Sequence, residues 1–304
     1  MTEYEVIIIG GGPAGLTAGL YTSRAGLKSL LIERGLFGGQ MVNARLVENY
    51  PGFPEGISGF DLGQVMHQQA LRYGLQITTE EVASITPGQP HRVEVTDGDL
   101  AAGAVIIATG SENQKLNAPG EERLVGRGVS YCATCDGFLF RDQKVAVIGG
   151  GDMAVTDATE LSQLAQKVYV IHRREQLRAG QVLQQRAFAA PRIQFLWNTV
   201  VDEVVGNEGK VSALKLRNVK TQQTSSLDID GVFVAIGLKP NSQRFVGLVQ
   251  LTETGHIITN ERMTTSVSGV FVAGDVRSNS ARQISTAVGD GATAAMSALR
   301  YLRR

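Results

Sequence analysis

The chain has 304 residues, enough for about two domains with cores of their own. Its 29 Lys and Arg residues balance its 29 Asp and Glu residues, which argues against a nucleic acid or an anionic membrane as the main partner. The 36 glycines are about 12% of the 304 residues, against a usual share of about 7%. This excess indicates tight backbone turns close to ligands.

The two cysteines, Cys132 and Cys135, are too few to staple a chain of this length, which favours a reducing compartment. The acidic start runs directly into the apolar segment 6–9, without the positive region of a signal peptide. No apolar run reaches the roughly 18 residues of a membrane span. We therefore expect a soluble, cytoplasmic protein without a membrane segment.

The first elements in chain order follow a recognisable pattern. The apolar segment 6–9 stops at a glycine-rich turn that begins with Gly10, and a helix-like segment occupies residues 16–24. A second apolar segment, 29–32, ends at the acidic Glu33. The order strand, glycine turn, helix, strand is typical of the βαβ unit that binds a nucleotide.

The same order occurs a second time further along the chain. A strand at 144–148 leads into a glycine turn at 149–154, a helix to about residue 165 and a strand at 168–171. Both copies end alike, with a strand that runs into a glycine. These closing strands lie at 105–110 and 232–237.

Two further patterns complete the predicted organisation. Alternating runs at 92–96 and 211–219 predict hairpin strands laid over each parallel sheet. After a turn-rich linker at 239–242, the tail has no nucleotide turn of its own and returns to the first domain with a helix at 284–302. We predict an α/β fold of two Rossmann-like, three-layer β/β/α nucleotide-binding domains, the second inserted into the first: 1–113 with 241–304, and 114–240.

The first turn is predicted to bind a dinucleotide. Gly10, Gly12 and Gly15 fit a G-x-G-x-x-G turn, whose glycines permit the tight turn, close backbone approach to pyrophosphate and helix–strand packing. The N–H groups at the start of the helix then bind the phosphates. Glu33 lies 18 residues after Gly15, where an acid accepts ribose hydroxyls. A glycine-rich turn without a ligand is the alternative, which the strand, the helix and the acid disfavour.

The second turn differs in charge, because the strand after it ends in a basic segment. Guanidinium groups bind phosphate bidentately, whereas a carboxylate would repel the 2′-phosphate of NADP(H). We therefore predict NADP(H) rather than NAD(H), with a solvated basic turn and a packing histidine as the alternatives. The predicted residues are Gly149, Gly151, Ala154, His172, Arg173, Arg174 and Arg178.

Two turns of different charge indicate two different dinucleotides, a flavin and a nicotinamide. Asp275 is placed by its Ala-Gly-Asp motif to accept hydrogen bonds from the ribityl hydroxyls of the flavin. Arg282 and Gln283, near the start of the last helix, are predicted to contact the isoalloxazine.

Cys132 and Cys135 have the spacing of a redox dithiol. Zinc is disfavoured because none of the four histidines is close in sequence, so we expect no metal site. Two buried cysteines without a redox role are the alternative. Asp136 adjoins Cys135 as a proton donor for a departing thiolate, or as a simple cap. The absence of cysteine from 1–113 excludes disulfide reductases whose redox pair lies near the first FAD motif.

The segment 132–137, Cys-Ala-Thr-Cys-Asp-Gly, precedes the second glycine turn and the basic segment, and this arrangement resembles the low-molecular-weight thioredoxin reductases. The resemblance implies FAD in the outer domain, NADPH in the inserted domain, a homodimer and thioredoxin as the electron acceptor. It also implies a large rotation of the inserted domain, with hinges at 112–115 and 239–242. It covers essentially the whole chain, with further motifs at 38–40, 47–53, 108–110 and 274–275.

The resemblance also implies roles for individual residues. Cys135 is the cysteine next to the flavin, Cys132 attacks the disulfide of thioredoxin, and Asp136 manages the protons. The implied FAD residues are Gly10, Gly12, Pro13, Ala14, Gly15, Glu33, Gly39, Gln40, Asn49, Ala108, Thr109, Gly110, Gly274, Asp275, Arg282 and Gln283. The implied NADPH residues are Gly149, Gly151, Asp152, Met153, Ala154, His172, Arg173, Arg174, Arg178, Ile236 and Gly237.

The sequence departs from the family in the second site. Met153 replaces a small hydroxyl residue, and Thr156 with Asp157 replaces a pair of glutamates. Met153 removes a donor and adds bulk beside the pyrophosphate, so other electron donors or acceptors stay open: ferredoxin, a second flavin, or molecular oxygen in a dithiol oxidase. A nucleotide-binding redox sensor has no need for Asp136 or both cysteines. The favoured interpretation carries electrons from NADPH through FAD and the Cys132–Cys135 disulfide to thioredoxin.

Overall fold

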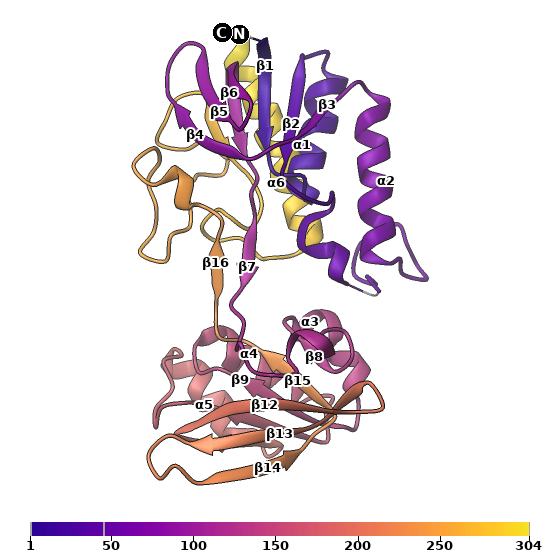
Figure 1. Ribbon diagram of the computed structural model, residues 1–304, viewed down its shortest axis with the longest axis vertical. Coiled ribbons are helices and arrows are strands. Elements are labelled where there is room, and N and C mark those ends of the chain that lie inside the picture. The colour runs from indigo at the N-terminus through magenta and orange to yellow at the C-terminus, as the bar shows by residue number, and fades with distance from the viewer. Residues whose placement is uncertain (1, 45, 304) are drawn as a thin grey trace. The chain divides into compact units, whose positions relative to one another are not determined.

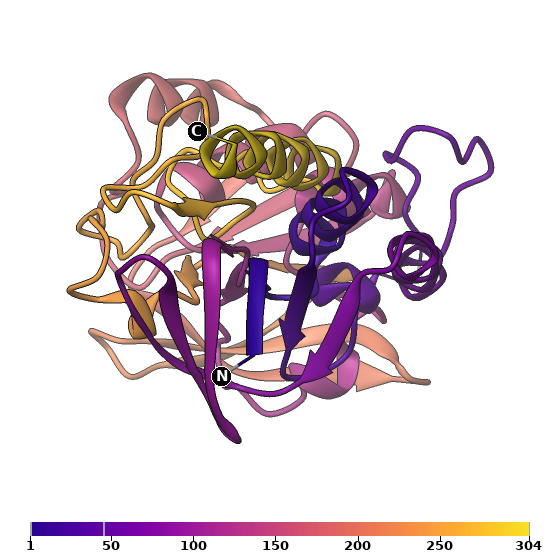
Figure 2. The same cartoon turned by 90° about the horizontal axis from the view of Figure 1, so that it is seen from above.

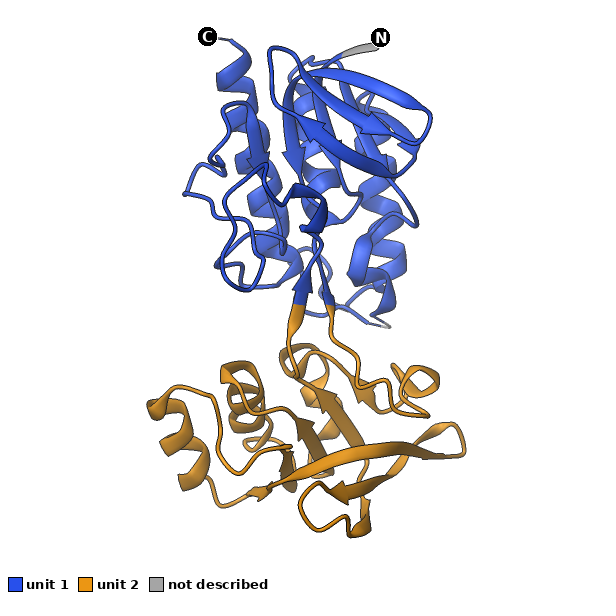
Figure 3. Cartoon of the chain, turned by 60° about the vertical axis from the view of Figure 1, so that its left-hand side comes forward, with its two compact units in different colours: residues 1–112, 239–304 blue, residues 113–238 orange. Residues whose placement is uncertain are grey.

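The structure, a computed structural model, describes residues 2–44 and 46–303. The chain forms two compact units, Met1–Glu112 together with Lys239–Arg304, and Asn113–Leu238 (Figure 3). Each unit is an α/β domain with a parallel sheet at its centre, which confirms the predicted fold class. Within the described ranges, no helix has both the length and the apolar character needed to cross a bilayer.

A seven-stranded sheet forms the middle of the first unit (Figure 1). Its parallel strands are β1 (Thr2–Ile9), β2 (Ser29–Glu33), β3 (Gln76–Thr79), β6 (Gly98–Ile107) and β17 (Val270–Val272). Strands β4 (Val82–Thr86) and β5 (His91–Val95) form the expected hairpin, but it is hydrogen-bonded to β6. The reason is the length of β6, whose first part pairs with β5 and whose end pairs with β17.

The sheet of the first unit is covered on both faces. Side chains alternate along β1, so Val6 and Ile8 pack in one buried cluster and Ile7 and Ile9 in another. The first cluster includes residues of α1 (Pro13–Arg24) and α6 (Ile284–Leu302), which lie side by side over the sheet (Figure 2). Helix α2 (Gly59–Arg72) packs beside α1. The second cluster joins the sheet to the β4–β5 hairpin and to the segment around Phe245.

The second unit repeats this layering. Its parallel sheet contains β11 (Ile193–Leu196), β10 (Lys167–Ile171), β9 (Lys144–Ile148), β15 (Gly231–Val234) and β8 (Val129–Ser130), in that order. An antiparallel sheet of β12 (Thr199–Asn207), β13 (Lys210–Asn218) and β14 (Thr224–Asp228) forms one outer layer, as the alternating run at 211–219 predicts. The other layer contains α3 (Ala133–Asp136), α4 (Asp152–Leu161) and α5 (Gln181–Ala189).

The chain passes between the units in two short strands that pair with each other. These are β7 (Ser111–Asn113) and β16 (Leu238–Pro240). Next to them, the Gln114 N–H donates to the Gly237 carbonyl at 3.0 Å, and the Asn241 N–H donates to the Gly110 carbonyl at 3.0 Å. Both crossings are therefore held together by backbone hydrogen bonds.

Candidate active site

The first glycine turn joins β1 to α1 in a shape that only glycine permits. Gly10 has a φ of 109°, and a Cβ there would lie 2.4 Å from the Ala108 carbonyl oxygen. A Cβ on Gly15 would lie 1.8 Å from the Gly10 carbonyl oxygen. At Gly12, by contrast, the nearest atom would be the Gly39 Cα at 3.9 Å. The outer glycines are needed for packing, whereas the middle one leaves the start of α1 open to a ligand.

Glu33 lies at the end of β2 beside this turn. Its Oε2 accepts the Gly11 N–H at 2.6 Å, and its Oε1 accepts the Gly35 N–H at 2.8 Å. These bonds fix the carboxylate at the position where sequence reasoning expected an acceptor for ribose. A carboxylate has about four acceptor sites, so two backbone bonds leave capacity for hydroxyl donors.

Three hydrogen bonds between two pairs of residues join distant parts of the chain. The Thr109 Oγ1 donates to the Asn241 carbonyl at 2.7 Å, and the Asn241 amide returns a bond to the Thr109 carbonyl at 3.0 Å. The Asn49 amide donates to the Gln283 Oε1 at 3.1 Å. Asn49, Thr109 and Gln283 were predicted from the sequence, whereas Asn241 was not. The sequence feature that could have pointed to Asn241 is the Lys239-Pro-Asn turn, which was interpreted only as a linker between the domains.

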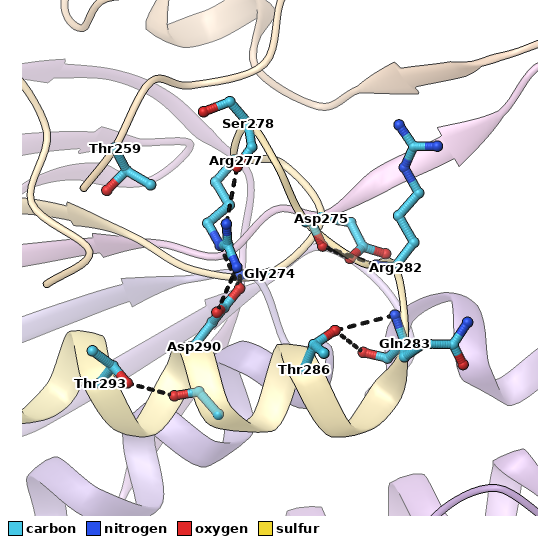
Figure 4. Close-up of polar contacts among 12 residues, drawn as sticks. Thr259, Gly274, Asp275, Arg277, Ser278, Arg282, Gln283, Thr286, Asp290 and Thr293 are labelled. Atoms are coloured by element: carbon cyan, nitrogen blue, oxygen red, sulfur yellow. Dashed lines mark hydrogen bonds and ion pairs between the residues drawn. The ribbon is translucent and has the colours of Figure 1, made fainter. Parts of the chain in front are cut away.

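Asp275, Arg282 and Gln283 lie on the loop that leads into α6 (Figure 4). The Ser280 Oγ donates to the Asp275 Oδ1 at 2.7 Å. Burial raises the pKa of Asp275, and the Ser280 hydrogen bond opposes that rise. Gln283 is the N-cap of α6 and shares a capping box with Thr286. The loop therefore presents polar groups next to the start of α6.

An ion pair that sequence reasoning missed holds the Gly274 end of this loop. Asp290, 5% exposed on α6, accepts the Arg277 Nε at 2.6 Å, the Arg277 Nη2 at 2.9 Å and the Gly274 N–H at 3.1 Å (Figure 4). One carboxylate thus fixes a backbone amide and a guanidinium at once. The available signal was a lone acid among the small residues of an apolar helix.

The second glycine turn, between β9 and α4, is built in the same way as the first. Gly149 has a φ of 149°, and a Cβ there would lie 2.3 Å from the Ala235 carbonyl oxygen and 2.7 Å from the Ala154 Cβ. A Cβ on the middle residue, Gly151, would meet nothing within 4 Å. Gly237, at the end of the closing strand, also has a positive φ, 129°. Each unit therefore has a turn that is open at its middle glycine.

The basic segment lies beside the second turn. Arg173, Arg174 and Arg178 have exposed side chains, and the Arg178 N–H donates to the Gly150 carbonyl at 2.7 Å. His172 is different, since it is 5% exposed and its ring occupies the place of a Cβ on Gly150, 2.4 Å away. Burial lowers the pKa of His172. His172 supports the turn by packing, and the arginines present their guanidinium groups to solvent.

Asp152 and Met153 occupy the first turn of α4. The Asp152 Oδ1 accepts the Gly180 N–H at 2.7 Å, which ties the start of α4 to the start of α5. Met153 is half-buried and packs against the cluster that contains Ala154 and Ala158. At least part of its bulk is therefore directed into the core.

Cys132 and Cys135 form a disulfide with a Cα–Cα distance of 5.3 Å. Cys132 is the N-cap of α3, and its Sγ accepts the Cys135 N–H at 3.2 Å. The Ser130 Oγ donates to the Asp136 Oδ2 at 2.5 Å. Burial raises the pKa of Asp136, and the Ser130 hydrogen bond lowers it in part. A carboxyl group with a raised pKa, one residue from a disulfide, is suited to hold a proton for a thiolate.

A buried glutamate that sequence reasoning also missed supports the residue before Cys132. Glu121 is 1% exposed and accepts the N–H groups of Leu116 at 2.9 Å and Asn117 at 2.8 Å. It also accepts the Tyr131 hydroxyl at 2.8 Å. Burial, and to a smaller extent this hydrogen bond, raise the pKa of Tyr131. Glu121 thereby links the first residues of the second unit to the disulfide segment.

Comparison with known proteins identifies the family. Residues 4–291 match the family described as pyridine nucleotide-disulphide oxidoreductase. The match spans far more than half of the chain, and the chain belongs to this family.

Several proteins to which the chain is similar are named thioredoxin reductase. The chain is 48% identical to a thioredoxin reductase of Listeria innocua, over 98% of this chain and 94% of the relative. It is 47% identical to a thioredoxin reductase of Bacillus subtilis, over 98% and 95%. Among solved structures, it is similar to the thioredoxin reductase of Streptococcus pyogenes, with 45% identity, 99% coverage of both chains and a TM-score of 0.94. The resemblance to thioredoxin reductases drawn from the sequence is confirmed.

Proposed function

We propose that the protein is a thioredoxin reductase that carries electrons from NADPH through FAD and the Cys132–Cys135 disulfide to the disulfide of thioredoxin. The observation that carries this proposal is the disulfide itself. It stands at the start of a helix, next to the half-buried Asp136, in the unit that also contains the glycine turn with a basic segment. The similarity to thioredoxin reductases over nearly the full length supports the same activity.

We assign FAD to the first unit. The open side at Gly12 and the first turn of α1, which has no side-chain cap, fit the pyrophosphate, and Glu33 fits the ribose. The loop held by Asp290 supplies Asp275, Arg282 and Gln283 for the rest of the cofactor. Bound FAD supplies a hydride acceptor for NADPH and a donor of two electrons to the disulfide.

We assign NADPH to the second unit. The turn at Gly149–Gly151 and the start of α4 fit its pyrophosphate. The exposed guanidinium groups of Arg173, Arg174 and Arg178 fit its 2′-phosphate, which they bind in bidentate fashion. Met153 packs in part against the core, and the side of Gly151 where a Cβ would point stays open.

The reduced cysteines then reduce thioredoxin by disulfide exchange. The Cys132 thiolate attacks one sulfur of the thioredoxin disulfide, and the other thioredoxin sulfur leaves as a thiolate. The Cys135 thiolate attacks Cys132 in the mixed disulfide, which restores the Cys132–Cys135 bond and releases the second thioredoxin sulfur. Asp136 supplies a proton to a departing thiolate. Two thiols are thereby oxidised and one disulfide is reduced.

The surface beside the disulfide suits a protein partner. Phe138 and Leu139, which follow α3 after Gly137, are 43% and 58% exposed. Contiguous exposed apolar side chains are typical of protein interaction surfaces. We assign thioredoxin to this surface. Assembly as a homodimer and a cytoplasmic location complete the proposal; they rest on the resemblance and are checked by light scattering and by fractionation.

The test is an anaerobic titration of the purified protein with NADPH, followed in the flavin absorption spectrum. One FAD per chain should bleach with NADPH, and added oxidised thioredoxin should restore the colour. Cys132→Ser and Cys135→Ser should bleach but lose the recovery with thioredoxin. A flavin that stays oxidised under excess NADPH, yet bleaches with dithionite, contradicts NADPH as donor and supports ferredoxin or a second flavin. Two flavins per chain would also support the second-flavin alternative.

A further inference from the structure

Helix α4 begins at the second glycine turn. One side of this helix packs against α3, the helix that carries the disulfide. Successive residues of an α-helix are about 100° apart, so residues three and four apart lie together. The buried stripe of α4 contains Ala154, Ala158 and Leu161. On the side next to this stripe lie Met153, Asp157 and Glu160.

Three contacts show that α3 packs against the part of α4 that contains Glu160 and Leu161. The Thr134 Oγ1, between the two cysteines, donates to the Glu160 Oε2 at 3.3 Å. Ala133 belongs to the same buried cluster as Leu161. A Cβ on Gly137 would lie 3.0 Å from the Leu161 Cδ2. Asp157, one turn before Leu161, is therefore on the side of α4 that the disulfide helix covers.

The Asp157 carboxyl group has an unusual environment. Burial raises its pKa to about 7, and the neighbouring Glu160 contributes to the rise. Asp157 is partly buried, and within the ranges that the structure describes no hydrogen bond opposes the rise of its pKa. The other titratable groups on elements packed against α4 are Asp136 on α3, Lys144 on β9, Lys167 and Tyr169 on β10, and Arg186 on α5.

These observations extend the redox role of the disulfide proposed above, on which the following inference rests. We propose that Asp157 is a positioning residue for the disulfide helix that takes up a proton when the Cys132–Cys135 disulfide is reduced. Reduction breaks the S–S bond and leaves one sulfur as a thiol and the other, Cys135 in the proposed mechanism, as a thiolate. The new negative charge on α3 raises the pKa of a carboxyl group on the facing side of α4.

The proton balance gives the inference a measurable consequence. With dithiothreitol as reductant, its two thiols supply two electrons and two protons and it leaves as a cyclic disulfide. In the parent above about pH 7, one proton goes to Cys132 and the other to ionised Asp157, so none is released. In Asp157→Asn the second proton goes to solvent. Releasing one proton makes the equilibrium constant rise tenfold per pH unit.

The experiment measures that equilibrium constant on the FAD-loaded protein under anaerobic conditions, from pH 6 to 8.5, by trapping and counting thiols. For the parent we expect less than a twofold change between pH 7 and 8, and for Asp157→Asn about a tenfold rise. Asp228→Asn removes an exposed carboxylate of the same unit and should behave as the parent does. Parallel curves for the parent and Asp157→Asn would overturn the proposal.

Two further variants keep the test decisive. Glu160→Gln retains Asp157 but removes the charged neighbour that raises its pKa. The pH range over which the equilibrium constant of the parent stays flat should therefore begin at a lower pH in this variant. This variant serves as the test if Asp157→Asn fails to fold. Loss of the flat region in Asp136→Asn, with Asp157→Asn unchanged, would assign the proton to Asp136 and overturn the proposal. If dithiothreitol reduces the disulfide but NADPH never does, the proposed function fails while the pH comparison still stands.

Discussion

The Asp290–Arg277 ion pair gives the sharpest prediction about the flavin-binding unit. Asp290→Ala removes two hydrogen bonds to a guanidinium and one to the Gly274 N–H. The substitution leaves the Arg277 guanidinium and the Gly274 N–H without this carboxylate. The site is buried, since Asp290 and Arg277 expose only 7% and 14% of their side chains. Breaking a buried pair by removing one partner costs about 3–5 kcal/mol. For a domain of this size each kcal/mol lowers Tm by about 2–4 °C, so we expect a fall of about 6–20 °C.

The assay is thermal unfolding followed by circular dichroism and by the rise in flavin fluorescence on release. Flavin release should move to lower temperature together with unfolding, because the same carboxylate holds Gly274. Adding Arg277→Met to Asp290→Ala should recover part of the loss, since it removes the unpaired charge. Thr293→Ala, on the same helix, should stay within about 0.5 kcal/mol of the parent. A loss under about 1 kcal/mol in Asp290→Ala would refute the reasoning.

Three other predictions address the proposed sites. Only Cys135→Ser should trap a mixed disulfide with a thioredoxin that lacks its resolving cysteine, as seen on a non-reducing gel; trapping by Cys132→Ser would reverse their roles. Replacing Arg173, Arg174 or Arg178 by Ala should raise the KM for NADPH about tenfold each and leave that for NADH unchanged, since a bidentate charged contact contributes about 1.5–3 kcal/mol; equal effects on both would contradict a 2′-phosphate site. Glu33→Arg should purify with little flavin, and a normal flavin content would contradict the first site.

The elements that position the site were predictable because they depend on local pattern. The strand, glycine turn and helix from β1 to α1 follow from apolar alternation and glycine spacing, and the last helix has the predicted bounds Ile284–Leu302. The pairing of Cys132 with Cys135 follows from their spacing.

The residues that hold the site in place were not predictable in this way. Asp290 and Glu121 are buried acids whose partners are backbone N–H groups and side chains supplied by loops. Sequence pattern records the residue type but not which amides a loop turns toward it. Glu121 follows Pro119 and Gly120, so it had the appearance of an exposed turn residue. His172 also shows this limit, because its neighbours are charged while its ring is buried under Gly150.

The paired strands β7 and β16 bring the two ends of the inserted unit to one place. The Gln114 N–H bonds the Gly237 carbonyl, so the 113–238 segment starts and finishes at neighbouring residues. Because the two ends of the 113–238 segment meet, joining them by a short linker costs little conformational entropy. If the segment is removed, a short turn is enough to connect residues 112 and 239 of the first unit. The second unit is therefore suited to excision as a separate protein and to circular permutation. New ends opened at an exposed turn such as the one after β13 would leave both nucleotide turns intact.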